Sequence, residues 1–573
     1  MCGILLHKRD GLKKEDFFNS LTQLNHRGPD SINYQNFNDL YIGHTRLSII
    51  DLSDNGSQPM TSNCNKYILS FNGEIYNFKE IKKDLVLKGY NFNSNTDSEV
   101  ILNGFIEYKN KIFKKLNGIF SIIIYDKVSD IITISRDSFG VKPLYYFIRE
   151  NEILLSSEIR VFNKYSEEDP ISKILFLSHG YLPTPNTTLK NVFSLKPGHY
   201  AKISNFKITF FKFFDIKSLF QTSKNSILND KIVYSAVKNQ LISDAKIGCF
   251  LSGGLDSSVL AYCASKYIED IETYSINFRN SEDEKKFQRA LIDKFSLSNK
   301  EKTVDYSDFK IHINKFLNHM DMPTVDGFNT YLVSKLAKEN GSKVAFSGIG
   351  SDEIFFGYPS YRKLGLLRFI KVFSKILPFR FLPSKYKKLD YLKLNSDYGV
   401  YMSKRAIFSI YEISKILEID KEKIIKTLNE YSLFANSNLS NFTLIEKIAY
   451  YEITKYMEGQ LLKDADVFGM ANSIEIRVPF LDINLVEAVL KIQSDLKLKS
   501  KYNKGLLINL FEGIIPKMIY QREKKGFELP YDDWINKSGI KKRIRAIYGK
   551  KLNLGSLHWS KIWALHILNI KIK

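Results

Sequence analysis

Short runs of apolar and β-branched residues, separated by turn-forming residues, occupy most of the first 212 positions of the chain. Runs of this kind predict β-strands, here at 67–71, 120–125, 131–135 and 144–147. Apolar residues recur at helical spacing in only two stretches, 16–24 and 97–109. We therefore expect sheets that are covered by a few helices.

The pattern changes after residue 230, where strands and helices alternate. Apolar runs predict strands at 247–251, 273–278 and 343–346, and a Gly-rich turn with a helix at 257–267 follows the first of them. This alternation indicates an α/β domain with a mostly parallel sheet. Residues 360–460 have a helical pattern.

The boundary between the two patterns falls near the polar stretch Gln221–Asn225, which we expect to be a linker. The expected domains are therefore 2–212 and 225–573.

Composition and charge narrow the class of protein. A chain of 573 residues that is 44% apolar is long enough for about two to four globular domains. Lys and Arg number 84 against 62 Asp and Glu, a net charge of +22. The excess is spread as single Lys residues, and the Lys-rich stretch 385–388 has no aromatic stacking platform beside it. We therefore expect solvated faces and no nucleic-acid partner.

The cysteines and the hydropathy pattern indicate the compartment. Cys2, Cys64, Cys249 and Cys263 are too few for a disulfide framework, and no Cys-x-x-Cys or His/Cys cluster suggests zinc. The N-terminus lacks the apolar core of a signal peptide, and no stretch reaches the roughly 18 uncharged apolar residues of a membrane helix. We expect a soluble cytoplasmic protein with no membrane partner.

Cys2 follows the initiator Met and would become the first residue after processing. It would then carry a thiol nucleophile and a free α-amine, whose reference pKa of about 7.7–8.0 suits a built-in base. A cysteine at this position is more often incidental, so the catalytic reading needs other motifs. Four are present: Arg27–Asp30 (RGPD), His44–Ile49 (HTRLSI), Asn72–Asn77 (NGEIYN) and Arg136–Tyr145 (RDSFGVKPLY).

Together with Cys2-Gly3-Ile4, these motifs resemble the class II glutamine amidotransferase domain of B-type, glutamine-dependent asparagine synthetases over nearly all of residues 1–200. The resemblance implies an N-terminal nucleophile fold, an α/β/β/α sandwich of antiparallel sheets, with Cys2 as the catalytic residue. It assigns the oxyanion hole to the side chain of Asn72 and the backbone amide of Gly73, and loss of such a donor typically costs about 10²–10³ in rate.

The resemblance also implies how glutamine would be held. Arg46 would pair with the α-carboxylate, while Glu74 and Asp97 would face the α-ammonium group. Backbone groups of Leu47, Ser48, Ile49 and Ile50 would complete the pocket. The alternative is ordinary turn chemistry for Gly28, Pro29 and Gly73 and a helix N-cap for Asp97, and neither role excludes the other.

In the second half, Ser252–Ser258 (SGGLDSS) follows a predicted strand and opens a predicted helix, which places backbone amides and hydroxyls where a phosphate group would lie. The segment lacks the Gly-Lys-Ser/Thr ending of a Walker A motif. It resembles the pyrophosphate loop of N-type ATP pyrophosphatases, although a Gly-rich turn would account for two of its residues. A second cluster, Ser347–Tyr358 (SGIGSDEIFFGY), contains carboxylates, which near a triphosphate usually bind magnesium.

Resemblance to the asparagine synthetases implies a doubly wound, mostly parallel ATP-pyrophosphatase domain with a helical C-terminal part. Asp256 and Asp352 would hold Mg²⁺, and Lys504 aligns with a lysine that stabilises the departing pyrophosphate. The motif Ser473–Asp482 (SIEIRVPFLD) is a later signature of the family. The implied ATP-binding residues are Phe250, Ser252, Gly253, Gly254, Asp256, Ser257, Ile276, Ser347 and Gly348.

The resemblance implies the conversion of ATP, aspartate, glutamine and water into asparagine, glutamate, AMP and pyrophosphate, through an acyl-adenylate and channelled ammonia. A homodimer would be typical of the family. The rival hypothesis, a basic nucleic-acid-binding protein with decayed sites, predicts steeply salt-dependent binding and no ATP turnover.

Two positions depart from the family pattern. Ile349 stands where asparagine synthetases have a carboxylate, and an aliphatic side chain cannot transfer protons. Either another carboxylate such as Glu353 or Asp326 substitutes, or the acceptor is another carboxylate such as a uronic acid of a surface polysaccharide. Phe356 replaces the usual glycine before Gly357. The segment 320–330 would determine acceptor specificity or be a loop without a ligand role.

Overall fold

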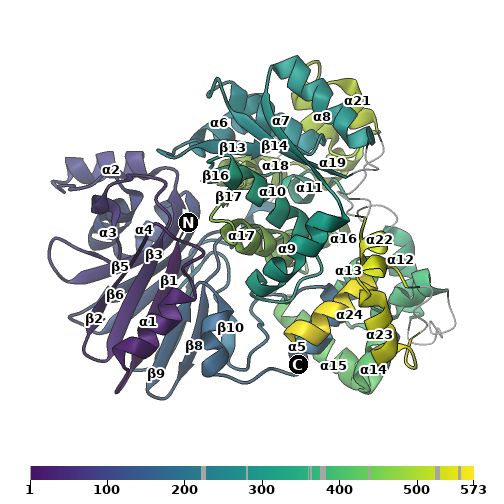
Figure 1. The fold of residues 1–573 in the computed structure, drawn as a ribbon, viewed down its shortest axis with the longest axis horizontal. Coiled ribbons are helices and arrows are strands. Elements are labelled where there is room, and N and C mark those ends of the chain that lie inside the picture. The colour runs from purple at the N-terminus through teal and green to yellow at the C-terminus, as the bar shows by residue number, and fades with distance from the viewer. Residues whose placement is uncertain are drawn as a thin grey trace.

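The computed structural model describes residues 2–220, 228–278, 282–358, 361, 364–374, 383–435, 439–522, 530–552 and 557–572. Two bodies of different architecture lie side by side, a purple-to-blue body of sheets and a teal-to-yellow body rich in helices (Figure 1). The expected linker Gln221–Asn225 lies outside the described residues.

The N-terminal body contains two six-stranded sheets within the described residues, and every neighbouring pair of strands is antiparallel. The first sheet has, in spatial order, β10 (Val192–Ser194), β8 (Tyr145–Arg149), β9 (Glu152–Ser156), β1 (Gly3–Arg9), β3 (Leu40–Arg46) and β2 (Ser31–Phe37). The second has β12 (Lys207–Lys212), β11 (His199–Ser204), β7 (Ile131–Arg136), β6 (Gly118–Asp126), β5 (Tyr67–Ile75) and β4 (Met60–Thr61).

Alternate side chains of the strands form an apolar core between these two sheets. Ile4, Leu6, Ile68 and Ile123 in this core are fully buried, and each such side chain contributes about 1.5–3 kcal/mol. Helix α1 (Lys14–Thr22) packs on the first sheet, and α2 (Phe78–Leu87), α3 (Asp97–Tyr108) and α4 (Ile112–Lys115) lie on the side of the second. The expected α/β/β/α sandwich is confirmed.

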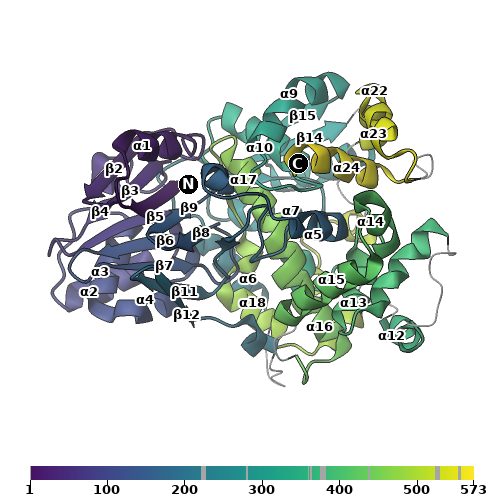
Figure 2. The ribbon, with the colours of Figure 1, turned by 90° about the horizontal axis from the view of Figure 1, so that it is seen from below.

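The expectation of only two helices in this half is wrong. Helix α2 buries Phe78, Ile81 and Leu85 at helical spacing. Helix α5 (Ile171–His179) is apolar on nearly all sides, so its sequence has no polar face to indicate a helix. The reason lies in its position, because α5 packs among helices of the other body (Figure 2).

The second body is built on a five-stranded sheet in which all neighbours are parallel. Its spatial order is β15 (Ser298–Val304), β14 (Glu272–Phe278), β13 (Ile247–Phe250), β16 (Val344–Phe346) and β17 (Glu475–Arg477). The chain runs outward from β13 to one edge and then from β16 to the other, which is the doubly wound arrangement that the sequence predicts. Ligands of such sheets bind where the order reverses, here between β13 and β16.

Helices cover the parallel sheet on both faces. The first layer contains α6 (Asp230–Asn239), α7 (Leu255–Ser265) and α8 (Glu282–Phe295), and the second contains α9 (Tyr306–His319), α10 (Phe328–Glu339) and α17 (Lys463–Met470) (Figure 1). Helices α11 (Ser351–Ile354), α18 (Ile483–Leu490), α19 (Ser494–Leu498), α20 (Gly505–Leu510) and α21 (Lys517–Gln521) are short.

The helical C-terminal part packs beside this sheet domain. Its α-helices are α12 (Leu364–Val372), α13 (Tyr398–Arg405), α14 (Ile410–Leu417), α15 (Lys421–Ala435), α16 (Leu444–Tyr451), α22 (Tyr531–Lys537), α23 (Ile540–Tyr548) and α24 (Trp559–Lys571). A π-helix, Glu452–Leu462, connects α16 to α17. Across the described ranges, every helix is too short or too polar to cross a bilayer.

Candidate functional site

Cys2 lies at the start of β1, buried between the two sheets and the second body. Its backbone nitrogen, which would be the free α-amine after processing, donates a hydrogen bond to Oδ1 of Asn72 at 3.0 Å. Its carbonyl oxygen accepts one from Nε of Arg27 at 3.1 Å. Burial raises the pKa of the thiol, against the lowering effects of the Leu47 backbone and Arg46. The thiol therefore depends on a nearby base to become a nucleophile.

A cavity of about 30 Å³, the Cys2 pocket, opens beside this thiol. Cys2 and the expected residues Arg46, Leu47, Ser48, Ile49, Ile50, Gly73, Glu74 and Asp97 line it. Asn72 lies behind the wall, where it binds Cys2. Sequence reasoning missed the other lining residues, Gly56, Gln58, Phe71, Thr96 and Ser98. Their residue types carry no signal for this role, since only the fold brings them here.

The guanidinium of Arg46 is held in one orientation at the pocket wall. Nη1 donates to the carbonyl of Ser53 at 2.7 Å, and Nη2 donates to that of Asp51 at 2.5 Å. Gly56 packs so closely that an added Cβ would lie 2.1 Å from Nη2. A fork fixed in this way is suited to a carboxylate because little side-chain entropy remains to be lost on binding.

Gly73 is required by its backbone geometry. Its φ is +149°, and an added Cβ would lie 2.0 Å from the carbonyl oxygen of Ile119 on the paired strand β6. Any side chain would therefore separate β5 from β6 beside the pocket.

Glu74 and Asp97 bring two carboxyl groups to the pocket. Asp97 Oδ2 accepts a hydrogen bond from the backbone N–H of Ile75 at 2.9 Å. Burial raises the pKa of Asp97 to about 7 and that of Glu74 well above its ordinary value. The alternative role of Asp97 as N-cap is wrong, because Thr96 caps α3 and accepts from the N–H of Glu99.

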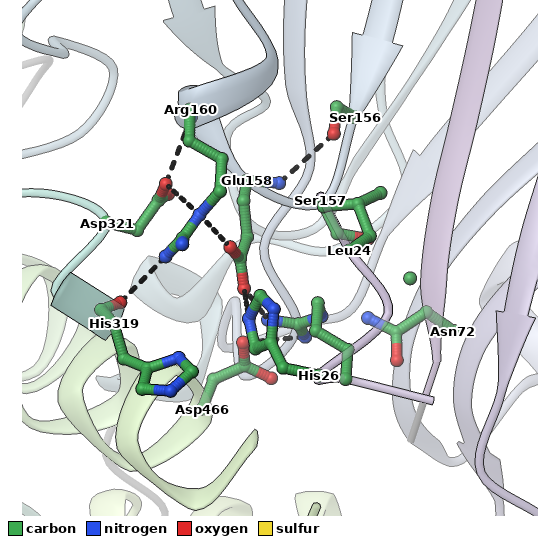
Figure 3. A network of polar contacts seen from close by, with 12 residues as sticks. Leu24, His26, Asn72, Ser156, Ser157, Glu158, Arg160, His319, Asp321 and Asp466 are labelled. Carbon is green, nitrogen blue, oxygen red and sulfur yellow. Dashed lines mark hydrogen bonds and ion pairs between the residues drawn. The ribbon is translucent and has the colours of Figure 1, made fainter. Parts of the chain in front are cut away.

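A buried network of charges joins the two bodies next to Cys2 (Figure 3). Arg27 pairs with Glu158 at 3.0 Å and with Asp466 of α17 at 2.8 Å. Arg160 pairs with Glu158 at 2.6 Å and with Asp321 at 3.5 Å. Removing one partner of a buried pair typically costs about 3–5 kcal/mol because a charge is left uncompensated. The network thus holds α17 against the Cys2 side of the sandwich.

The segment Ser252–Ser258 lies at the point where the parallel sheet reverses its strand order. It follows β13 and leads into α7, so it is the loop that the sequence predicts. Ser252 and Ser257 approach each other at 3.1 Å between their Oγ atoms, and Ser258 Oγ donates to the carbonyl of Gly254 at 2.6 Å. These contacts join the two ends of the segment and fix the conformation of the glycines between them.

Two carboxylates, from the first turns of α7 and α11, converge on one ammonium group. Lys504 Nζ lies 2.5 Å from Asp256 Oδ2 and 2.8 Å from Asp352 Oδ1. Although its burial opposes this, the two carboxylates raise the pKa of Lys504. An added Cβ on Gly357 would lie 2.0 Å from Asp352 Oδ1 and 2.5 Å from Lys504 Cε. Gly357 therefore has to be a glycine for this charge cluster to assemble.

The cluster faces a cavity of about 1150 Å³, the switch-point cavity. Of the expected ATP and metal residues, Ser252, Gly254, Asp256, Asp352 and Lys504 line it. Phe250, Gly253, Ser257, Ile276, Ser347 and Gly348 are absent from its wall. Gly348 supports the wall, since an added Cβ would lie 2.8 Å from Cβ of Asp256.

Ile349 is partly buried and packs against the apolar core. Of the two proposed substitutes, Asp326 lines the switch-point cavity. Glu353 is buried behind Tyr358, which lines the cavity and donates its hydroxyl to Glu353 Oε1 at 2.6 Å. Burial raises the pKa of Glu353 to about 7, and neighbouring Asp352 adds to the increase. Both carboxyl groups are therefore available to the cavity, Glu353 only through Tyr358.

Phe356, the second departure from the family pattern, has an unusual backbone conformation. Its φ is +57°, in the left-handed region that a glycine adopts without strain. A non-glycine residue there costs about 1–2 kcal/mol. Its ring stacks on Tyr361 with centroids 4.5 Å apart, and Lys497 lies 4.6 Å above it. These contacts offset the backbone strain.

Comparison with known families decides the class of protein. The asparagine synthase family matches residues 230–562, and the glutamine amidotransferase domain matches residues 1–214. The chain belongs to the asparagine synthase family. Asparagine synthetase (glutamine-hydrolyzing) 1 of Bacillus subtilis (strain 168) is 31% identical over 99% of this chain and 93% of its own length. Asparagine synthetase (glutamine-hydrolyzing) 3 of the same organism is 27% identical over 96% and 90%.

Other members carry different names. Amidase chry2 of Gibberella zeae is 23% identical over 95% of this chain and 89% of its own length. The asparagine synthase family membership makes this protein a glutamine-dependent ligase that hydrolyses glutamine and uses ATP. The resemblance seen in Cys2, NGEIYN and SGGLDSS is confirmed.

Arg477 lies in the family signature Ser473–Asp482, but the sequence predicted no role for it. Its guanidinium reaches out of β17 toward Glu74 of the Cys2 pocket, 3.7 Å away, and pairs with Glu475 at 2.6 Å. Its backbone carbonyl accepts from the N–H of Ser347, where the second loop begins. Only the pairing of β16 with β17 brings this side chain to the other body.

Proposed function

We propose that the protein forms an amide from a carboxylate in two coupled half-reactions, with aspartate as the acceptor and asparagine as the product. The observation that carries this proposal is the presence of both sites in one chain. The Cys2 pocket holds a nucleophile, a fixed arginine and two carboxyl groups. The switch-point cavity holds a phosphate-type loop with a lysine and two carboxylates. We place the two domains at 2–212 and 225–573.

Glutamine hydrolysis would proceed at Cys2. Arg46 binds the α-carboxylate of glutamine, and Glu74 with Asp97 binds its α-ammonium group. The thiol passes its proton to the α-amine, attacks the side-chain amide carbon and releases ammonia, which leaves a thioester. Asn72 and Gly73 donate hydrogen bonds to the oxyanion. Water then hydrolyses the thioester to glutamate and the free thiol.

Adenylation would proceed in the switch-point cavity. Asp256 and Asp352 fit Mg²⁺, because this ion usually takes one or two carboxylates together with substrate phosphates. No cluster of three or more His, Cys, Asp and Glu that could hold a metal occurs in the described part of the chain. Mg²⁺, when bound, would screen the phosphate charge. Ser252 and Gly254 would bind the pyrophosphate group, and Lys504 would stabilise its negative charge as it leaves.

The acceptor carboxylate attacks the α-phosphorus of ATP and releases pyrophosphate, and ammonia then attacks the acyl carbon to give the amide, AMP and a proton. Since Ile349 cannot take that proton, we assign it to Glu353, through the hydroxyl of Tyr358. A carboxyl group with a pKa of about 7 is well matched to proton transfer near neutral pH.

A second candidate is the same chemistry on another carboxylate, such as a uronic acid. The observation that favours it is the aromatic lining of the switch-point cavity away from the loop. Tyr181, Tyr358, Tyr401, Tyr456 and Trp559 contribute to this lining. Their flat faces and hydroxyl groups would suit a ring that carries both apolar and polar edges better than the short chain of aspartate.

One experiment separates the two candidates. The purified protein would be incubated with glutamine, ATP and Mg²⁺, first with aspartate and then with sugar acids, while pyrophosphate and amide products are followed by mass spectrometry. Pyrophosphate matched by asparagine supports the first candidate. Pyrophosphate only with a sugar acid supports the second. Absence of glutamine hydrolysis in every mixture would contradict both.

A further inference from the structure

A third cavity, which we call the basic pocket, opens where the two bodies meet. It measures about 210 Å³, and none of its lining residues belongs to the Cys2 pocket or the switch-point cavity. Its wall contains the titratable groups Lys196, His199, Lys212, Asp215, Lys217, Tyr450, Lys455 and Glu458. Lysine side chains are almost never fully buried unless they are paired, and nearby like charges disfavour each other's charged form.

The two acidic groups in the wall already have partners. Asp215 accepts a hydrogen bond from Lys212 Nζ at 2.7 Å. Glu458 pairs with Arg136 at 3.0 Å and accepts from Thr184 Oγ1 at 2.7 Å. These pairs balance Lys212, and neither of them involves Lys196 or Lys455.

Lys196 and Lys455 are the lysines that remain without a negative partner. Neither ammonium group has an ion pair or hydrogen bond to any residue that the structure describes; Lys455 only lies 5.4 Å from the ring of Tyr431. Lys196 is exposed and Lys455 half-buried, so a ligand in solution can reach both. They come from different bodies, Lys196 from the connection between β10 and β11, and Lys455 from the π-helix.

The lysines also affect each other's protonation. Desolvation lowers the pKa of Lys196, and Lys212 adds to this decrease. Burial lowers the pKa of Lys455 to about 8, and Lys196 adds to the decrease although Glu458 opposes it. A bound anion would reverse both effects, since an opposite charge within about 4–6 Å favours the charged form.

We propose that the basic pocket binds a compact phosphate-type oxyanion, inorganic phosphate or pyrophosphate, between Lys196 of the N-terminal body and Lys455 of the C-terminal body. The cavity, at about 210 Å³, is smaller than the roughly 300–1,000 Å³ of sites for drug-sized ligands, which favours a small anion over a nucleotide. Hydrogen bonds from ammonium groups to a phosphate are among the stronger ones in proteins. The anion links the two bodies and stabilises their contact.

The test is isothermal titration of the full chain with phosphate and, separately, with pyrophosphate at constant ionic strength. It uses K196Q and K455Q, with K207Q as the matched control, because Lys207 is exposed on the neighbouring strand β12 and outside the pocket. A K504A variant keeps the basic pocket while it weakens anion binding at the switch-point cavity. We expect the affinity for the anion to fall about tenfold or more in K196Q and in K455Q and to stay unchanged in K207Q. In K504A, binding at the basic pocket should still be measured.

Binding should also raise the melting temperature of the wild-type chain, and this rise should be lost in K196Q and K455Q. Tighter binding of one anion than of the other identifies which of them the site prefers. Equal affinities of K196Q, K455Q and K207Q, or loss of all anion binding in K504A, would overturn the proposal. If K455Q does not fold, K196Q still tests the same site, because Lys196 is exposed and its substitution should leave the fold intact.

Discussion

The Cys2 pocket measures about 30 Å³, whereas the switch-point cavity measures about 1150 Å³. The small pocket is lined by strand residues, by the segment 47–58 and by the start of α3, and carbonyl groups hold its arginine in one orientation. The large cavity lies between loops and helices, and its central lysine is paired with the two carboxylates that we assign to the metal. One site is therefore organised for a single small substrate, and the other has to accept several ligands in turn.

The comparison teaches where variation in this enzyme is tolerated. A change at Gly73 would separate two strands, because the space for a side chain is filled by backbone. At the switch-point cavity, Phe356 stands in a left-handed conformation that suits glycine, and aromatic contacts offset the strain. Ile349, at the position where the family pattern has a carboxylate, packs against the apolar core. We therefore expect variation at the acceptor side and little at the glutamine side.

The largest effect is expected from Cys2→Ala. Glutamine hydrolysis should be abolished, because Cys2 is the one thiol among the described residues in the wall of the pocket, whereas activity with added ammonia should remain. Glutamate release and amide formation from ammonium chloride are the two measurements. Cys64→Ala is the matched control, since Cys64 is exposed and is not among the residues that line the pocket. Persistent glutamine hydrolysis in Cys2→Ala would contradict the assignment.

Lys504→Ala should have the next largest effect, confined to the other site. Loss of a cation at a departing phosphate group should lower pyrophosphate release by about 10²–10³-fold. Glutamine hydrolysis should continue, because Lys504 is absent from the Cys2 pocket. Lys499→Ala, an exposed lysine nearby, serves as control. An equal loss in both half-reactions would indicate damage to the fold instead.

A smaller effect is expected from pH at the Cys2 pocket. The α-ammonium group of glutamine needs an ionised partner, and the pKa of Asp97 is raised to about 7 by burial. The KM for glutamine should therefore fall as pH rises, by about tenfold between pH 6 and 8, as the ionised fraction increases. Steady-state kinetics would show this change lost in Asp97→Asn. The KM for ammonia in the synthetase reaction, corrected for protonation, should not follow it.

The raised pKa of Asp97 should make the folded protein less stable as pH rises, although glutamine binding improves over the same change. Because the folded protein holds a proton on Asp97 more tightly than the unfolded chain, this group contributes stability at low pH that is lost as pH rises through about 7. Asp97→Asn should therefore remove part of the decrease in melting temperature between about pH 4 and pH 7, the range between the unfolded and the folded pKa. A larger decrease in the variant would be inconsistent with this account.

The smallest effect is expected from a change between the two sites. A void of about 10 Å³, room for about one water-sized molecule, is lined by residues of both bodies, among them Tyr145, Gly459 and Val467. Val467→Phe should obstruct it and partly uncouple the sites, so that less amide forms per glutamine hydrolysed. Val467→Ala, which enlarges the void, should keep the coupling. A ratio unchanged by Val467→Phe would place ammonia transfer elsewhere.

The chemistry and architecture of the two halves were determined by local sequence. Strand runs with turn residues predicted sheets covered by helices, and alternation of strands and helices predicted the parallel sheet. The sandwich was implied by the family resemblance of the motifs. Cys2, the NGEIYN motif and SGGLDSS each carry a backbone or side-chain requirement within a few residues. Such requirements can be recognised in sequence because they depend on neighbours along the chain, as the SGGLDSS segment shows by following β13 and opening α7.

Tertiary structure alone decided what depends on distant neighbours. Helix α5 escaped recognition because the other body covers the side that would otherwise be polar. Arg477 reaches Glu74 and Lys504 joins Asp256 to Asp352 only because strand order and loop closure bring distant segments together. Electrostatic interactions and burial depend on distance in space, and for these residues sequence separation contains no information about that distance.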